Sequence, residues 1–209
     1  MVIYARIPVR YLLPIAPAPQ SYGGVVLRIL REALFFESLF RANKWTWFFG
    51  WIFHYALLVV LLRHLFFVTW SLEPWVIMLF FPGDVAAWLM IGSLLGLLGR
   101  RIFVDRVRYI STVSDYAMLI LILLIGITGL ALRYKVPVDI MATREFMLGL
   151  MKLDLSDLPR NGVLYLHLAS VVILVIVFPF SKLVHFPGYF FSPSHNQKYP
   201  NAKMKNLSE

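Results

Sequence analysis

Cysteine is absent from the 209-residue sequence. The chain therefore has no disulfide bond, no thiolate ligand for a metal ion and no cysteine-ligated iron–sulfur cluster. Covalent attachment of a c-type haem through Cys-x-x-Cys-His is excluded for the same reason. Any redox cofactor of this protein is consequently held by side chains other than cysteine.

Charged residues are scarce as well. They make up 15% of the chain, against 60% hydrophobic and 16% aromatic residues, and the mean hydropathy is +0.74. Soluble domains carry about 25% charged residues on average. The composition excludes an ordinary soluble enzyme and predicts a membrane protein.

Four apolar stretches approach the roughly 20 residues that a membrane-spanning helix needs. They cover residues 45–67, 75–99, 115–132 and 163–185. We expect a break in the second near residues 81–84, where Pro and Gly end an upper turn and leave a short span. Strands of a membrane barrel are much shorter than these stretches. The predicted fold class is an all-α integral membrane protein with four transmembrane helices.

The sequence ahead of the first span differs in character. Residues 1–20 contain four prolines and are predicted to be extended, and no secretory signal peptide is expected. Residues 25–40 mix charged and apolar side chains at helical spacing, which predicts an amphipathic helix on the membrane surface, with a partner-binding helix as the alternative. We divide the chain into an N-terminal segment (1–44), a transmembrane domain (45–186) and a tail (187–209).

Basic residues outnumber acidic ones by 20 to 11. They cluster before the first span, between the second and third spans, and after the fourth: Arg28, Arg31, Arg41 and Lys44; Arg100, Arg101, Arg106 and Arg108; Lys198, Lys203 and Lys205. The positive-inside rule places these clusters on the cytoplasmic side, so both ends of the chain are predicted to be cytoplasmic, in the inner membrane. Because topology accounts for the positive charge, no nucleic-acid partner is expected.

Four of the five histidines fall inside predicted spans: His54 and His64 in the first, His167 and His185 in the fourth. Ionisable residues inside a bilayer usually mark a functional path, although a single histidine can also be a hydrogen-bonded core residue. Neutral imidazole is a good ligand for haem iron, and two imidazoles hold a b-type haem without a covalent link. A zinc or copper site is a weaker alternative, because its ligands converge on one point whereas these pairs are far apart, and no carboxylate in the spans completes the set. A proton relay is the other alternative, but it does not require matched pairs.

The two helices run in opposite directions, so we expect His54 to pair with His185 and His64 with His167. The spacings of ten and eighteen residues correspond to about 15 Å and about 27 Å along a helix. The eighteen-residue spacing is an integral number of helical turns, which predicts that both imidazoles of the fourth span share one face. Tilt, an inclined haem plane or a kink at Pro179 must absorb the difference in length.

These residues carry a family resemblance. Residues 51–64, and residues 166–185 with the run Phe-Pro-Phe-Ser-Lys-Leu-Val-His, resemble the gamma subunit of respiratory nitrate reductase (the NarI family). The resemblance implies a di-haem b helix bundle in which each haem has two histidine ligands, with quinol oxidised near the distal haem. Members of this family usually begin with one further spanning helix, and none is visible before Tyr4 in this sequence.

Further runs at residues 38–47, 104–111 and 190–197 are similar to the DsrM branch of these cytochromes, which belongs to the dissimilatory sulfite reduction complex. This similarity implies electron transfer between menaquinone and a cytoplasmic iron–sulfur subunit resembling DsrK, itself similar to heterodisulfide reductase. It also implies further subunits resembling DsrJ, DsrO and DsrP. The alternatives are a subunit of a nitrate reductase or heterodisulfide reductase, and a cofactor-free membrane anchor.

Anionic haem propionates need cationic partners in or near lipid. Arg63, Arg108 and Lys182 are the candidates, and the last two are equally well interpreted as interfacial residues that snorkel.

A quinone site is expected beside the distal haem. Quinol oxidation releases protons, so the site needs an acceptor, for which Glu73 and Asp84 are the candidates. Trp70 could stack on a quinone ring, and an interfacial aromatic belt is the alternative interpretation of this residue.

Overall fold

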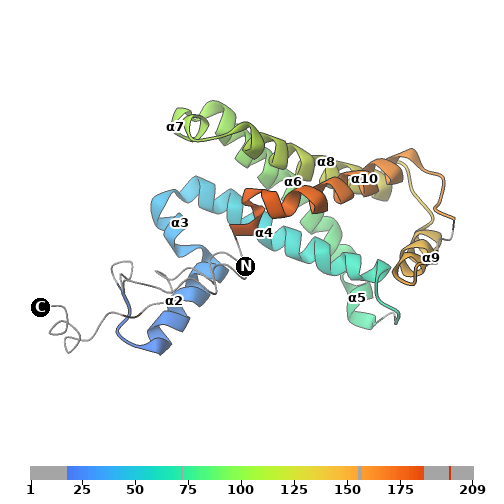
Figure 1. Cartoon of the computed structure of the whole chain (residues 1–209), viewed down its shortest axis with the longest axis horizontal. Helices are drawn as coiled ribbons and strands as arrows, with labels where there is room; N and C mark the ends of the chain where they lie inside the picture. Colours follow the sequence, from blue (N-terminus) through green and yellow to red (C-terminus); the bar gives the residue numbers. More distant parts are fainter. Residues whose placement is uncertain (1–17, 72, 155–156, 186–197, 199–209) are drawn as a thin grey trace, which may run out of the picture. The chain divides into compact units, whose positions relative to one another are not determined.

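The computed structural model describes residues 18–71, 73–154, 157–185 and 198 (Figure 1). Within these residues the regular structure is helical, and no strand occurs. Four helices are long and apolar enough to cross a membrane: Lys44–Phe67, Phe80–Phe103, Val113–Tyr134 and Gly162–Phe180. The predicted all-α fold with four membrane-spanning helices is therefore confirmed. The predicted tail, residues 187–209, lies outside the described residues except for Lys198.

The chain divides into two compact units, Trp45–Val177 and the pair of segments Met1–Lys44 and Phe178–Glu209. We call them the bundle and the terminal unit. The bundle contains α4 (Lys44–His64), α5 (Pro74–Met78), α6 (Phe80–Phe103), α7 (Asp105–Tyr109), α8 (Val113–Tyr134), α9 (Ile140–Met151) and α10 (Gly162–Val177). The terminal unit contains α2 (Tyr22–Phe35), α3 (Glu37–Ala42) and the 3-10 turns η2 (Phe178–Phe180) and η3 (Lys182–Val184).

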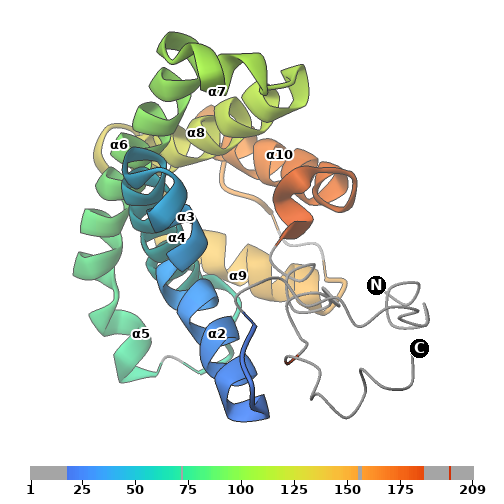
Figure 2. The same ribbon diagram turned by 90° about the vertical axis from the view of Figure 1, so that its left-hand side faces the viewer.

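In the bundle, α10 packs against α8, and α8 packs against α6 (Figures 1 and 2). Helix α4 meets α6 through long side chains. A Cβ atom at Gly96 would lie 2.5 Å from the Phe49 ring, so only glycine leaves room for that ring. Arg100 of α6 also donates a hydrogen bond of 3.2 Å to the Thr46 hydroxyl of α4.

Most of the surface of the spanning helices faces outwards. Between 11% and 28% of the most apolar stretch of each span is buried inside the protein. Large apolar side chains such as Trp88, Val175 and Ile176 are at least 59% exposed. Apolar surface of this extent is favourable in hydrocarbon and strongly unfavourable in water, so the helices are built for contact with lipid.

The second span corrects one sequence prediction. Helix α5 ends at Met78, Leu79 joins it to α6, and α6 then runs without interruption through residues 81–84. Pro82 lies in the first turn of α6, where its missing N–H leaves no intrahelical hydrogen bond unmade. The stretch is therefore broken, as expected, but at Leu79 and not at residues 81–84, and α6 is a full span of 24 residues and not a short one.

The fourth span corrects another. A continuous helix over residues 163–185 was expected, but α10 ends at Val177 and is followed by the turns η2 and η3. Pro179 lies inside η2, and a proline both lacks an amide hydrogen and crowds the preceding turn. His185 is thus the residue after η3, and the argument that it shares one helical face with His167 is wrong.

The structure also shows the helices of two further segments. The amphipathic stretch forms α2 and α3, which are separated at Phe36 by a left-handed backbone conformation with φ of 50°. The connection between the third and fourth spans contains α9, whose first turn is capped by the Asp139 carboxylate. This oxygen accepts hydrogen bonds from the amides of Met141 and Ala142 at 2.9 and 3.0 Å.

Arg144 fixes α9 against the end of α4. Its guanidinium donates hydrogen bonds to the carbonyl oxygens of Phe66, Thr69 and Trp70 at 3.0, 2.8 and 3.2 Å. These carbonyls belong to the 3-10 turn Leu65–Phe67 and the residues after it, where a helix end leaves acceptors without intrahelical partners. One arginine therefore positions the whole connection beside the end of α4.

Replacing Arg144 by glutamine should loosen this connection. The variant loses most of the charge-assisted hydrogen bonds to the three carbonyls, which we expect to lower the stability of the bundle by about 1–3 kcal/mol. Thermal unfolding in detergent and limited proteolysis between α8 and α10 would measure the effect. Arg160→Gln removes the same charge from an exposed position of the same connection and should behave as the unchanged protein. Equal proteolysis of both variants would contradict the role of Arg144.

Candidate haem-binding site

His64, from the last turn of α4, and His167, from α10, come together in the bundle, where His64 is exposed and His167 half-buried. Their ring centroids are 6.4 Å apart and the ring planes differ by 12°. A metal-bound imidazole nitrogen lies about 2 Å from the metal, so two imidazoles on opposite sides of one iron have centroids about 6 Å apart. The observed separation therefore fits two axial ligands of one haem iron.

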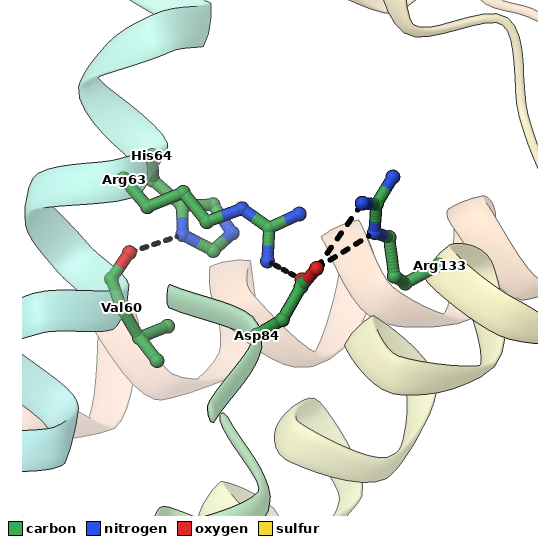
Figure 3. A network of polar contacts seen from close by, with 5 residues as sticks. All are labelled: Val60, Arg63, His64, Asp84 and Arg133. Atoms are coloured by element: carbon green, nitrogen blue, oxygen red, sulfur yellow. Dashed lines mark hydrogen bonds and ion pairs between the residues drawn. The ribbon is translucent and has the colours of Figure 1, made fainter. Parts of the chain in front are cut away.

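The hydrogen bonds of these two rings decide which nitrogen can bind a metal. His64 Nδ1 lies 2.7 Å from the Val60 carbonyl oxygen (Figure 3). A carbonyl can only accept, so Nδ1 carries the hydrogen and the lone pair is on Nε2. His167 Nδ1 lies 2.9 Å from the Thr128 hydroxyl of α8. In both rings Nε2 is the nitrogen suited to ligation.

His54 and His185 have the same local arrangement. His54 Nδ1 lies 2.7 Å from the Gly50 carbonyl oxygen, and His185 Nδ1 lies 2.9 Å from the Lys182 carbonyl oxygen. Both rings therefore carry hydrogen on Nδ1. His54 belongs to the bundle and His185 to the terminal unit.

The donor set favours haem over a bare metal ion. The described residues contain no group of three or more His, Cys, Asp or Glu side chains placed to hold a metal ion. An ion held by protein side chains alone commonly takes three or four of them. Two facing imidazoles suit a cofactor that brings its own in-plane nitrogens, and haem is such a cofactor.

A cluster of charged side chains lies beside His64. The Asp84 carboxylate of α6 accepts a hydrogen bond of 2.5 Å from Arg63 of α4. Its other oxygen accepts bonds of 3.2 and 3.1 Å from Arg133 of α8 (Figure 3). The Asp84 side chain is 13% exposed and that of Arg63 is 19% exposed. The cluster joins three spanning helices and carries one net positive charge next to a candidate ligand.

The path of the Arg63 side chain requires a glycine. A Cβ atom at Gly83 would lie 2.4 Å from Arg63 Cδ, so any larger residue would displace the arginine. The guanidinium also lies 5.2 Å from the centre of the Phe80 ring. Gly83 and Phe80, both in the first turn of α6, thus guide Arg63 to Asp84.

The remaining candidates lie at different ends of the bundle. Trp70 and Glu73 follow the end of α4 near His64; Lys152 lies 4.4 Å from the centre of the Trp70 ring, and Glu73 accepts a hydrogen bond of 2.5 Å from Ser71. Arg108 lies on α7, between α6 and α8, and pairs with Asp105 at 2.6 Å on an exposed surface.

Lys182 belongs to the terminal unit, where it begins η3.

Sequence reasoning missed three residues that shape this site. Thr128 is a polar residue inside an apolar run, and this position in a span was the available signal. Arg133 lies one residue beyond the predicted third span (115–132), but it is the last but one residue of α8. Arg144 lies on a helix that the sequence pattern did not predict, so no signal was available for it.

Comparisons with known proteins show relatives of this chain. It is 34% identical over 218 residues to the Hdr-like menaquinol oxidoreductase cytochrome b-like subunit of Archaeoglobus fulgidus, an alignment of 91% of this chain and 66% of the relative. The protein of the same name from Archaeoglobus profundus is 28% identical over 221 residues, or 91% of this chain and 65% of the relative. The chain thus spans just under two-thirds of the length of these curated relatives. No protein-family model and no solved structure matches it.

Asp84→Asn should destabilise the bundle because it leaves the partly buried Arg63 without its counter-charge. Removing one partner of a buried pair costs about 3–5 kcal/mol. Asp105→Asn is the matched control, since the Asp105 side chain is 88% exposed and its pair should contribute less than about 1 kcal/mol. Thermal unfolding in detergent measures both. In a cycle with Arg63→Gln, the double variant should lose less stability than the sum of the single ones, and additive losses would contradict the coupling.

Proposed function

We propose that this protein is a membrane cytochrome b that transfers electrons between the quinone pool and a cytoplasmic iron–sulfur partner. The observation that carries the proposal is the facing pair of His64 and His167, with Nε2 of each ring suited to ligation. Two relatives whose names include cytochrome b-like subunit support it, since they align with 91% of this chain.

In this proposal His64 and His167 would hold one haem b, and His54 and His185 would hold a second. Each haem would supply a site that accepts and returns one electron. The protein contributes the ligands, their hydrogen-bonded orientation and a low-dielectric surrounding of apolar helices. Because α4 carries both His54 and His64, it would provide one ligand of each pair.

Arg63, Arg108 and Lys182 remain our candidates for the propionates. The position of Arg63 next to His64, in a cluster with a net positive charge, supports its assignment to an anionic group of the cofactor. The pairing of Arg108 with Asp105 on an exposed surface instead supports the snorkelling interpretation for Arg108.

We further propose that quinol is oxidised near the haem held by His64 and His167. Glu73 is the better proton acceptor of the two candidates, since it is exposed whereas both oxygens of Asp84 accept hydrogen bonds from arginines. Trp70 is 56% exposed at the same end of α4 and offers a flat ring surface to a quinone. The substrate in the names of both relatives is menaquinol, and we propose menaquinol for this chain too.

The partner is proposed to be an iron–sulfur subunit resembling DsrK, with further subunits resembling DsrJ, DsrO and DsrP. The term Hdr-like in the names of the relatives supports a partner similar to heterodisulfide reductase. We further propose that the protein lies in the inner membrane and takes part in dissimilatory sulfur metabolism.

Histidine replacement tests the ligand assignment directly. The unchanged protein should bind two haems per chain, measured as pyridine haemochrome. His64→Ala and His167→Ala should each lose the same haem, identified by its absorption band and midpoint potential, because each removes one axial ligand of the same iron. His54→Ala and His185→Ala should both lose the other haem.

The fifth histidine provides the control. His195 lies outside the predicted spans and the described residues, so His195→Ala should retain both haems. If the unchanged protein binds no haem, or if His64→Ala and His167→Ala lose different haems, the ligand pairs are wrong.

Replacing Glu73 tests the quinone site. Glu73→Gln should slow the reduction of the haems by a menaquinol analogue on the order of 100-fold, because it removes the proton acceptor. Haem content and midpoint potentials should stay unchanged. Stopped-flow absorption in the haem band measures the rate. Glu145→Gln makes the same change at an exposed position of α9 and should keep the original rate; an unaffected rate in Glu73→Gln would place the acceptor elsewhere.

A further inference from the structure

Helix α8 carries none of the predicted ligands, yet one of its side chains contacts His167. Thr128 is 5% exposed, and its hydroxyl oxygen lies 2.9 Å from His167 Nδ1. Helices α8 and α10 pack closely along their lengths. A buried hydroxyl of one helix therefore meets the ring of a candidate ligand on its neighbour.

The other contacts of Thr128 decide the direction of this hydrogen bond. Its hydroxyl oxygen lies 2.8 Å from the Leu124 carbonyl oxygen and 3.0 Å from that of Ile125. Both carbonyls can only accept, so the single hydroxyl hydrogen is donated to them. The hydroxyl then accepts from His167, whose Nδ1 must carry the hydrogen. This leaves the lone pair of the ring on Nε2.

The next residue of α8 also lies near the ring. A Cβ atom at Gly129 would lie 3.4 Å from His167 Cε1 and 3.9 Å from its Nδ1, which is ordinary van der Waals contact. The ring therefore has α8 at residue 129 on one side and the Thr128 hydroxyl at Nδ1, and the hydrogen bond at Nδ1 is the directed contact that sets its orientation.

We propose that Thr128 is the positioning residue for His167. It holds the imidazole in the tautomer with hydrogen on Nδ1 and directs Nε2 towards His64. The inference rests on the proposed function, because the purpose of that orientation is to present Nε2 as a haem ligand. Thr128 itself does not touch the cofactor; it acts through His167, as partners of metal-binding histidines commonly do.

The two imidazoles of this pair are oriented by different means. His64 donates to the Val60 carbonyl four residues earlier in its own helix, so its orientation is a property of α4. His167 donates to a side chain of another helix, so its orientation can be changed by one substitution that leaves both backbones in place. This difference makes the role of Thr128 separable from the fold.

Thr128→Val tests the proposal, because valine has nearly the same shape but cannot accept a hydrogen bond. Losing the acceptor makes Nε2 a weaker donor to the iron, which favours the ferrous over the ferric state. We expect the midpoint potential of the haem that depends on His167 to rise. A tenfold change in this equilibrium equals about 59 mV for a one-electron couple. The other haem should keep its potential in redox titrations of the full chain in detergent.

Two variants and one control sharpen the test. Thr128→Ser keeps the hydroxyl and should restore the original potential, while Thr128→Ala should raise it without adding any atoms. Thr143→Val is the matched control: Thr143 is 6% exposed and its hydroxyl donates to the Asp139 carbonyl oxygen at 2.7 Å, but α9 carries no candidate ligand. This control should leave both potentials unchanged.

The outcomes separate this inference from the proposed function. If Thr128→Val and Thr128→Ala both bind two haems with unchanged potentials, or if Thr128→Ser shifts the potential as far as they do, Thr128 does not position His167. An equal shift in Thr143→Val would likewise overturn the inference. If instead His167→Ala retains both haems, the ligand assignment itself fails, whatever the Thr128 variants show.

Discussion

Every polar group inside the spanning helices must find its partner within the protein, because hydrocarbon offers none. The Asp84 carboxylate shows how strongly this constraint shapes the bundle. Its oxygens accept hydrogen bonds from Arg63 and Arg133, so one acidic side chain joins α4, α6 and α8. A charge left unpaired at this depth would be far more costly than in water. The pairing therefore fixes how the three helices are placed around the end of α4 that carries His64.

The same constraint accounts for the histidines. Each of the four rings uses Nδ1 in a hydrogen bond to an oxygen atom, three of them to a backbone carbonyl and His167 to the Thr128 hydroxyl. Satisfying one nitrogen this way leaves the other as the nitrogen suited to a metal, so the requirement for internal partners also orients the proposed ligands. The exposed apolar surface of the bundle is suited to lipid.

Several features could be predicted from the sequence because they depend on composition and local spacing. The four long apolar runs predicted the four spans, and the histidine positions predicted the candidate ligands. Other features could not be predicted. The sequence predicted that Pro82 breaks a helix, but Pro82 lies in the first turn of α6, where proline is tolerated. A kink at Pro179 was considered for the fourth span, but α10 already ends at Val177. Whether a proline starts, bends or ends a helix depends on which residue begins it, and packing decides that.

The sequence by itself determined that this chain is helical, has four helices suited to a membrane and carries His54, His64 and His167 within them, because hydropathy and residue type are local properties. Only the tertiary structure decided which side chains meet across helices. His64 lies beside His167, Asp84 lies between two arginines, Thr128 is within hydrogen-bond distance of His167, and Arg144 of α9 binds the carbonyls after α4. Partners 21 to 103 residues apart in the sequence are brought together by the packing of helices, and no periodicity along the chain encodes that packing.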